Sequence, residues 1–519
     1  MINKNININI LYVLIIVCTA VAINQYFGNI GVYPIDSFFS FNASYEILNN
    51  KYPFRDYWTI TGPFMDVTQA ILFYLFGVNW SIYVLHASIV NAILGVIVYF
   101  FLINFSLSKN YSLCYALLTV SLAYPSAGTP YVDHHASILS IISLLVFIIA
   151  VKKETTSLWY CLPILFFICF LTKQSPTTYI FLIIGIFYII NLFFSRQYFL
   201  TIKILIETLV LIFIIFIIFN YLEIKLIDFY TQYIDYPLSI GGNRLDEYLF
   251  PFDLNRILIR QKWIHLSLLP LYILFFKKLI NKDFKSNKEF IYFGSIILSS
   301  FAFIAHQLMT INGYFIFFLI PIYAGFSHCF IKNKIFKKEI SFLLIIFLVS
   351  IYYFNKYVQS RHFMDLTKDD LKYKIEGKLI HEKLHPLKWI TYRSAKKPLK
   401  EITELNEVIE IIKNDKSNIA LITDYQFISV ILDINDNSPS KYWYDYHVYP
   451  NKDHRIYNFY RKFFIEALEK ENVEKIYIIK PIVGAENIVE KIFDNNCYLK
   501  TTKTVILDIY NINNCLDKY

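Results

Sequence analysis

Two acidic residues stand in the polar gap that follows the first long apolar run of this sequence. Asp36 lies in the segment YPIDSFFS (33–40), and Asp56 follows Arg55 in the segment KYPFRDYW (51–58). A carboxylate at the edge of an apolar region can act as a general base, because it can accept a proton from a hydroxyl or an amine. Asp36 is therefore our candidate base, although a loop acid, a helix N-cap or a partner for Arg55 would show the same pattern. We expect Arg55 and Asp56 to contribute to substrate binding.

A second candidate catalytic acid, Asp133, stands in the segment PYVDHHAS (130–137), just before another apolar run. Hard divalent cations prefer carboxylate oxygens, so we expect Asp133 to face Asp36 across a cavity and to share a metal ion with it. The alternative is that Asp133 caps the N-terminus of the next helix, where aspartate is favoured. Adjacent histidines point in different directions on a helix. Only one of the two that follow Asp133 is therefore expected in the site, and we assign His134.

Basic and aromatic residues at other ends of apolar runs are candidates for binding an anionic substrate. Lys173, in FLTKQSP (170–176), stands at an expected outer helix end, where the positive-inside rule makes lysine uncommon. A cation there could hold a lipid phosphate, or the side chain could simply extend to the membrane surface. Arg244 is a candidate from its position in the polar loop 222–262. Tyr314 stands at another rim, where a tyrosine can also belong to an interfacial aromatic belt.

The composition is that of a membrane protein followed by a more polar segment. The chain has 519 residues, of which 56% are hydrophobic and 18% aromatic, and its mean hydropathy is +0.44. Soluble globular proteins average roughly 45–50% apolar residues, and here the excess lies in runs that end near residue 355. The net charge of +9 arises largely from lysines in the short gaps between these runs. That pattern is typical of membrane topology and argues against nucleic-acid binding.

Eleven apolar runs are candidates for membrane-spanning helices, which need roughly 20 residues to cross a bilayer. They are 8–27, 80–105, 110–125, 135–151, 157–172, 176–194, 202–221, 263–277, 290–306, 313–330 and 340–356. The run 63–77 is shorter and carries Asp66 and Gln69, so we predict that it lies in the membrane interface. Lysines and arginines then gather in alternate gaps, which the positive-inside rule assigns to the cytoplasm. An odd number of spans places residues 357–519 outside the cell membrane.

Residues 357–519 have the pattern of a soluble α/β domain that follows a membrane domain of residues 1–356. Helical periodicity and short apolar strands predict a small three-layer domain with a partly parallel sheet. The predicted helices are 402–413 and 455–471, and the predicted strands are 418–423, 475–480 and a closing pair within 497–510. Cys497 and Cys515 could form a disulfide if this domain is extracytoplasmic.

The order of these short motifs resembles that of polytopic GT-C glycosyltransferases, the relatives of protein O-mannosyltransferases and of lipid A aminoarabinose transferases. The stretch NNKYPFRDYWTITGPFMDVTQAILFYLFGVNW resembles their first outer loop, and PYVDHHASILS resembles their second-loop acid. FLTKQSP resembles their T-K element, and NGYFIFFLIP their late tyrosine element. The resemblance covers about residues 1–330. The chain departs from it at Ser37, since several members have a glutamate directly after the aspartate.

The resemblance implies transfer of a sugar, with inversion, from a polyprenyl-phosphate donor to an extracytoplasmic glycan, lipid or protein. Asp36 would deprotonate the acceptor, and Lys173 matches a family element beside the donor. A divalent metal ion is the one cofactor that the resemblance suggests, and metal dependence varies among these enzymes. It also implies a multi-pass protein of the inner (cytoplasmic) membrane of a bacterial cell envelope, in contact with membrane lipids.

Three other functions are compatible with parts of the pattern. An O-antigen ligase or polymerase would place its key basic residues in a large late outer loop such as 222–262. A lipid or sugar transporter, or a flippase, would carry charged residues near mid-membrane and repeated halves, and this sequence has neither. A non-catalytic receptor would bind through the C-terminal domain. The sequence identifies neither the sugar nor the acceptor.

Overall fold

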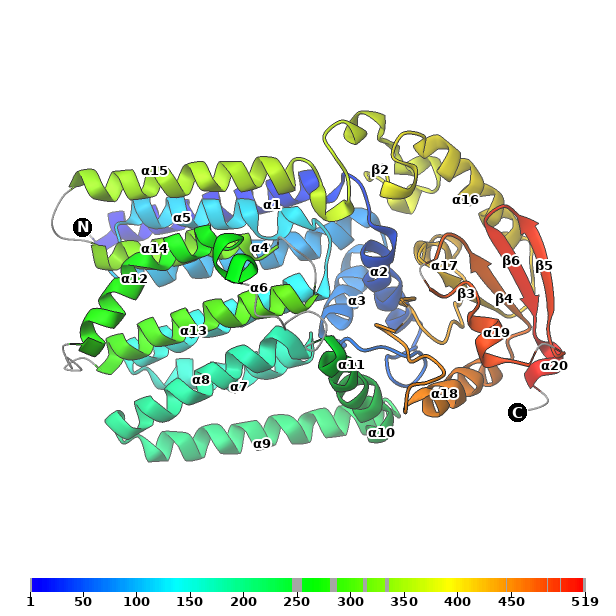
Figure 1. The fold of residues 1–519 in the computed structure, drawn as a ribbon, viewed down its shortest axis with the longest axis horizontal. Helices are drawn as coiled ribbons and strands as arrows, with labels where there is room; N and C mark the ends of the chain where they lie inside the picture. The colour runs from blue at the N-terminus through cyan, green and yellow to red at the C-terminus, as the bar shows by residue number, and fades with distance from the viewer. Residues whose placement is uncertain are drawn as a thin grey trace. The chain divides into compact units, whose positions relative to one another are not determined.

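The computed structural model describes residues 2–244, 254–280, 287–310, 315–331, 336–444, 446–482, 484–494 and 496–516. Their contacts form two compact units, each built from three stretches of the chain. Unit 1 comprises Met1–Asn29, Val84–Ile215 and Leu245–Phe363. Unit 2 comprises Ile30–Tyr83, Phe216–Arg244 and Met364–Tyr519. The first is a helical bundle, and the second combines helices with a sheet (Figure 1).

The helices of the bundle coincide with the eleven predicted spans. They are α1 (Ile2–Gly28), α4 (Trp80–Asn104), α5 (Lys109–Leu122), α6 (Val132–Lys153), α7 (Thr156–Phe170), α8 (Gln174–Ser195), α9 (Tyr198–Tyr221), α12 (Lys262–Ile280), α13 (Asn287–Thr310), α14 (Leu319–Ile331) and α15 (Phe336–Tyr353). By length and composition, eight helices of the described chain can cross a membrane. Helices α7 and α14 are apolar but shorter, and α5 has 14 residues. The prediction of a polytopic helical membrane protein is thereby confirmed.

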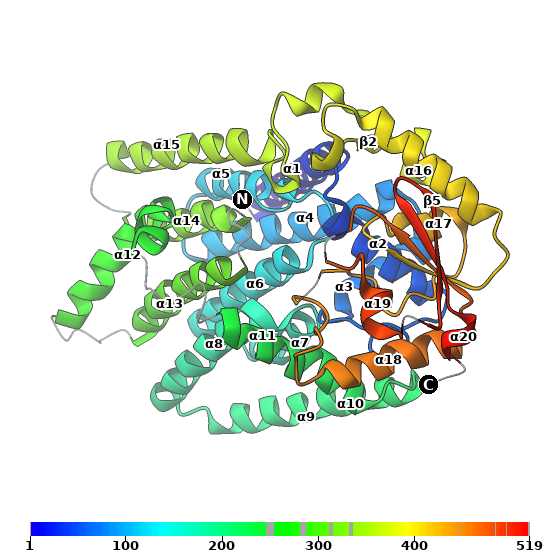
Figure 2. The same cartoon turned by 45° about the vertical axis from the view of Figure 1, so that its right-hand side comes forward.

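Helix α6 lies in the middle of the bundle, and α9 lies at its margin (Figure 1 and Figure 2). In α6, 83% of the most apolar window is buried, compared with 6% in α9. Helix α6 packs against α7, α8 and α13. The apolar, exposed surface of α9 suits contact with lipid, because lipid tails do not penalise exposed apolar side chains.

The turn before α6 is held by a buried arginine. The Arg361 guanidinium is fully buried and donates hydrogen bonds to three carbonyl oxygens, those of Pro125 (2.7 Å), Ser126 (3.2 Å) and Ala127 (3.0 Å). Buried carbonyl groups between two helices need such donors, because no helical bond satisfies them. This arrangement fixes where the chain enters α6, and therefore where Asp133 in its first turn lies.

Unit 2 is organised around a four-stranded sheet with the strand order β3-β4-β6-β5. The strands are β3 (Ile419–Thr423), β4 (Lys475–Ile479), β5 (Leu499–Thr504) and β6 (Leu507–Asn511). Strands β3 and β4 are parallel, and the other two pairs are antiparallel. The helices of this part are α16 (Pro398–Lys413), α17 (Phe427–Leu432), α18 (Tyr457–Lys470), α19 (Ile488–Ile492) and α20 (Asn513–Leu516). The predicted helices, the predicted strands and the partly parallel sheet are confirmed.

The stretch 30–83, predicted as an outer loop, packs within unit 2 against the C-terminal part of the chain. Helix α2 (Pro34–Leu48) contacts α17 and α3 (Phe64–Phe76). The Asn42 side chain donates a 2.6 Å hydrogen bond to Ser429 Oγ. Most of α2 is buried as a result.

The stretch 216–244 also belongs to unit 2. It contains the end of α9 and the short helices α10 (Leu226–Phe229), η2 (Tyr230–Asp235) and α11 (Tyr236–Arg244). The Gln232 side chain donates to the Phe54 carbonyl (3.0 Å) and accepts from the Thr59 N–H (3.1 Å). The Tyr236 hydroxyl donates to the Tyr446 carbonyl (3.2 Å), so this stretch and the stretch 30–83 both contact residues beyond the linear boundary at 356 and 357.

Helix α3 buries polar side chains and exposes apolar ones. Asp66 and Gln69 are 3% and 0% exposed, whereas Tyr74 is 80% exposed. The other exposed apolar residues are Val67, Ile71, Leu75 and Phe76. An apolar exterior on a short helix suits the membrane interface. The interfacial position of 63–77 agrees with this burial and stays a prediction.

Cys497 and Cys515 form a disulfide that links the start of the last strand pair to α20. The pairing that the sequence allowed is therefore present. Among the described residues, the remaining cysteines are free.

The buried Asp66 makes the stability of unit 2 depend on pH. Burial raises the pKa of the Asp66 carboxyl to about 7, whereas aspartate in an unfolded chain titrates near about 3.9. The folded protein then keeps a proton that the unfolded chain has lost, so stability should fall as the pH rises from about 4 to about 7. Asp66→Asn should weaken this dependence and stabilise the protein above about pH 7 by roughly 1–3 kcal/mol.

Thermal unfolding in detergent micelles at several pH values measures this effect. Asp369→Asn, at an exposed aspartate, is the control and should keep the wild-type slope. An Asp66→Asn protein with the same pH slope as wild type would contradict the assignment.

Candidate functional site

Asp36 lies in the first turn of α2, and its side chain is partly exposed. The residue before the helix is Tyr33, so Asp36 is not the N-cap, and Pro34 occupies the first turn, where its missing N–H is not needed. Asp36 Oδ1 accepts a 2.7 Å hydrogen bond from the Tyr442 hydroxyl. The N-terminus of a helix also favours a negative charge. Two elements of unit 2 therefore hold this carboxylate.

Aromatic rings surround this end of α2. The Tyr33 ring stacks on Tyr392 with 4.9 Å between centroids, and the Tyr442 ring meets the Phe39 ring at 5.3 Å. Burial raises the pKa of the Tyr33 phenol, and the neighbouring Tyr392 and Asp36 raise it further. Tyr33 is therefore neutral at physiological pH. The surroundings of Asp36 thus combine apolar ring faces with hydroxyl groups.

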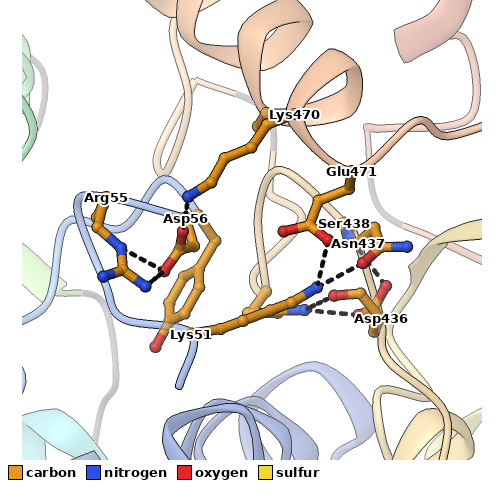
Figure 3. Close-up of a pocket in the computed structure, with 11 residues that line it drawn as sticks. Lys51, Arg55, Asp56, Asp436, Asn437, Ser438, Lys470 and Glu471 are labelled. Atoms are coloured by element: carbon orange, nitrogen blue, oxygen red, sulfur yellow. Dashed lines mark hydrogen bonds and ion pairs between the residues drawn. The ribbon is translucent and has the colours of Figure 1, made fainter. Parts of the chain in front are cut away.

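A small pocket lies elsewhere in unit 2 (Figure 3). It is lined by Lys51, Arg55, Asp56, Tyr57, Asp436, Asn437, Ser438, Lys441, Ala467, Lys470 and Glu471. Figure 3 shows Asp56 between Arg55 and Lys470. Asp56 Oδ2 accepts from Arg55 Nε (2.9 Å) and from the Tyr52 N–H (2.7 Å). Its Oδ1 accepts from Lys470 Nζ at 2.7 Å.

These donors keep Asp56 ionised. Burial alone would raise the pKa of its carboxyl, but the hydrogen bonds from Arg55 and Lys470 outweigh burial and lower that pKa. A carboxylate whose two oxygens are bound to cations is a weak base. Asp56 therefore fastens the stretch 51–58 to α18, and Arg55 holds Asp56 in place. The predicted role of both residues in substrate binding stays a prediction.

Two further pairs occupy the other side of the pocket. Lys51 Nζ is bonded to Asn437 Oδ1 and lies 3.7 Å from Glu471 Oε2. Lys441 Nζ lies 2.8 Å from Asp436 Oδ2, and both side chains are at most 1% exposed. The charged groups that line this pocket thus compensate one another. The pocket is best described as an ionic network between the stretch 30–83 and the C-terminal part.

A separate buried cluster lies in unit 1, where Asp133 meets Lys173 and His306. Lys173 Nζ lies 2.5 Å from Asp133 Oδ1, and His306 Nε2 lies 3.4 Å from the same oxygen. His306 Nδ1 lies 2.7 Å from Ser175 Oγ. Asp133 is in the first turn of α6, Lys173 directly precedes α8, and His306 is near the end of α13. The structure therefore brings Asp133 and Lys173 together at helix ends.

The remaining three predicted site residues are His134, Arg244 and Tyr314, and no contact of the described residues assigns them to a substrate site. His134 is fully buried, with Nε2 3.0 Å from the Ala123 carbonyl oxygen and its ring stacked on Phe318. These contacts account for His134 by packing, and its role in binding stays a prediction. Arg244 ends α11, and its side chain lies outside the described part. Tyr314 lies outside the described residues.

The described residues offer no cluster of candidate ligands for the metal ion that was predicted between Asp36 and Asp133. Within the ranges that the structure describes, no group of three or more His, Cys, Asp or Glu side chains could hold a metal ion. Asp133 is also already paired with Lys173. No step of the reaction proposed below involves a metal, and the shared cation stays a prediction.

Three residues of these contacts were not predicted from the sequence: Tyr442, Lys470 and Ser175. Tyr442 lies in SKYWYDYHVYP (440–450), where the density of aromatic residues in an otherwise polar part of the chain was an available signal. Lys470 is one of several lysines on an amphipathic helix, so its sequence context does not distinguish it. Ser175 directly follows the TKQ of the T-K element, and its histidine partner is far away in the sequence.

No family model matches this chain, and no curated protein matches it. Among solved structures, the oligosaccharyltransferase of Archaeoglobus fulgidus, crystallised with a tethered acceptor peptide that contains the NVT sequon, is similar to it. The match covers 90% of this chain and 69% of that chain, with 11% sequence identity and a TM-score of 0.43.

The ion pair between Asp133 and Lys173 predicts strong coupling between these residues. Lys173→Met leaves the buried Asp133 charge without this cation and should lower the free energy of unfolding by about 3–5 kcal/mol. Adding Asp133→Asn should recover most of the loss, because the uncompensated charge is then gone. The free energies of unfolding of the wild type, the two single variants and the double variant, measured in detergent micelles, form a double-mutant cycle.

Lys288→Met is the control in the same unit, because it removes the partner of Glu154 from an ion pair with half-exposed side chains. It should cost less than about 1 kcal/mol. Additive effects of Lys173→Met and Asp133→Asn would show that the pair does not act as a unit.

Proposed function

We propose that this chain is a membrane glycosyltransferase of the GT-C type that uses a polyprenyl-phosphate sugar as its donor. The acceptor would be an extracytoplasmic glycan, lipid or protein. The observation that carries the proposal is the placement of Asp36, a partly exposed carboxylate at the start of a helix just after the first candidate span. The Tyr442 hydroxyl donates a hydrogen bond to one of its oxygens, which favours the ionised form that a general base needs.

In the proposed reaction, Asp36 removes the proton from the acceptor hydroxyl or amine while the acceptor atom attacks the anomeric carbon. The bond between that carbon and the phosphate oxygen breaks, and the polyprenyl phosphate leaves with the bonding electron pair. The proton remains on Asp36 and passes to water afterwards. A single displacement of this kind inverts the anomeric configuration.

We assign Lys173 to the phosphate of the donor, where a cation stabilises the charge that develops on the leaving group. Its contact with Asp133 supports a positioning role for that aspartate, because an ion pair holds a long, flexible lysine in one conformation. The predicted placement of both residues at span ends suits a donor whose phosphate lies at the membrane surface.

We further propose that residues 357–519 lie outside the cytoplasmic membrane. Two observations support this location. Lysines gather in the gaps assigned to the cytoplasm, and Cys497 and Cys515 are paired, which is typical of oxidising compartments.

Cysteine accessibility tests the location. In a variant whose free cysteines are replaced by serine, Val505→Cys places a thiol at an 87% exposed position between β5 and β6. An impermeant maleimide should label it in intact spheroplasts. Glu154→Cys, in a gap assigned to the cytoplasm, should be labelled only after lysis. The reverse pattern would place the C-terminal part in the cytoplasm and refute the assignment of the site.

The role of Asp36 is tested by Asp36→Asn, which keeps the size of the side chain but cannot accept a proton. Sugar transfer by the purified protein should fall by about 10²–10⁴-fold, while donor binding is retained because the phosphate contacts lie on other residues. Asp369→Asn should have wild-type activity. Transfer by Asp36→Asn at a near wild-type rate would refute the mechanism. Lipid movement across the bilayer without any transfer by the wild type would favour a flippase.

A further inference from the structure

We infer that Tyr442 is the positioning residue for the Asp36 carboxylate, and that the C-terminal part of the chain thereby takes part in the reaction. This inference rests on the proposed function, since it assigns Asp36 as the base. It adds a residue from beyond the region in which the sequence resembles known transferases. It also gives the C-terminal part a role other than binding an acceptor.

Residues 436–443, the α2-binding segment, contact α2 near both of its ends. Near the start of the helix, the Tyr442 hydroxyl donates to Asp36 Oδ1, and its ring meets that of Phe39 one turn further on. Near the end of the helix, Lys441 Nζ lies 3.8 Å from Glu46 Oε1. Two adjacent residues therefore fix both ends of the helix that carries the proposed base.

The α2-binding segment is itself tied to the sheet. Asp436 Oδ1 accepts hydrogen bonds from the backbone N–H of Leu421 in β3 (3.1 Å) and of Ser438 (3.0 Å). Lys441 Nζ donates to Asp436 O (2.9 Å) and to Asp436 Oδ2 (2.8 Å). The position of the Tyr442 hydroxyl is thus set by buried contacts that reach strand β3, at the edge of the sheet. A catalytic group supported in this way keeps one orientation through the reaction.

The chemistry of a phenol suits this task. A hydrogen bond to a carboxylate favours the ionised form, which a general base needs before it can accept a proton. A lysine or arginine at the same place would favour that form much more strongly and would weaken the base. Tyr442 orients Asp36 without adding a charge.

Tyr442→Phe tests the inference, because it keeps the ring but removes the hydroxyl. The acid limb of the pH profile of kcat/KM should move to higher pH by about one unit, so that activity on that limb falls about tenfold. The KM for the donor should stay within about twofold of wild type, because donor binding does not involve this hydroxyl. A merely structural role would lower the amount of folded enzyme without moving the limb.

Tyr457→Phe is the matched control, because it loses a hydrogen bond of the same length, 2.7 Å, from a phenol of the same part to the Lys491 carbonyl. It should leave the pH profile unchanged. The thermal midpoints of both variants show whether they fold.

A second measurement does not need activity. A hydrophobic carbodiimide modifies protonated carboxyl groups, so mass spectrometry of the Asp36 peptide across pH reports its protonation. The labelling curve of Tyr442→Phe should move to higher pH, in the direction of the kinetic limb. Unchanged labelling and an unchanged limb would overturn the inference and leave the proposed function intact. If the wild-type protein transferred no sugar but the labelling curve of Tyr442→Phe were still shifted, the proposed function would be refuted, and the hydrogen bond from Tyr442 to Asp36 would still be supported.

Discussion

A carboxylate withdrawn from water must be met by a cation or by hydrogen-bond donors, and this constraint organises both units of the protein. In unit 1 it joins Asp133 on α6 to Lys173 before α8. In unit 2 it joins Asp56 to Lys470 on α18, across more than four hundred residues of sequence. Burying each pair has a cost in desolvation free energy, and each pair fixes a contact between distant stretches of the chain. Buried backbone carbonyl groups also need hydrogen-bond donors, and the buried Arg361 supplies them to three carbonyl groups of one turn.

Asp36 meets this constraint with a different kind of partner. A tyrosine hydroxyl holds one of its oxygens, and the side chain stays partly exposed. Through this hydrogen bond, a residue of the C-terminal part contacts the carboxylate that we propose as the base. This contact also joins the stretch 30–83 to the C-terminal part. The residue proposed to act on the acceptor depends on Tyr442, and Tyr442 depends on the sheet through Asp436.

The sequence predicted the elements well because periodicity and hydrophobic run length depend on neighbouring residues. All eleven expected spans are helices, and the strands and helices of the α/β part lie where their patterns placed them. Asp133 and Lys173 both stand at helix ends, as their local patterns indicated, but the ion pair between them joins positions 40 residues apart and was not predicted. The burial of α2 could not be foreseen either. Its sequence, rich in phenylalanine and serine, has no clear apolar face, and Ser429, which binds its Asn42, is 387 residues away.

The stereochemistry of the product tests the central claim most directly, because a single displacement assisted by a general base permits one outcome. The purified protein would be given a polyprenyl-phosphate sugar of defined anomeric configuration, and the glycosidic product would be examined by NMR through its anomeric coupling constant. The account predicts that the configuration at the anomeric carbon is inverted relative to the donor. Retention would require two displacements or a covalent glycosyl-enzyme, and it would contradict the assignment of Asp36 as a base.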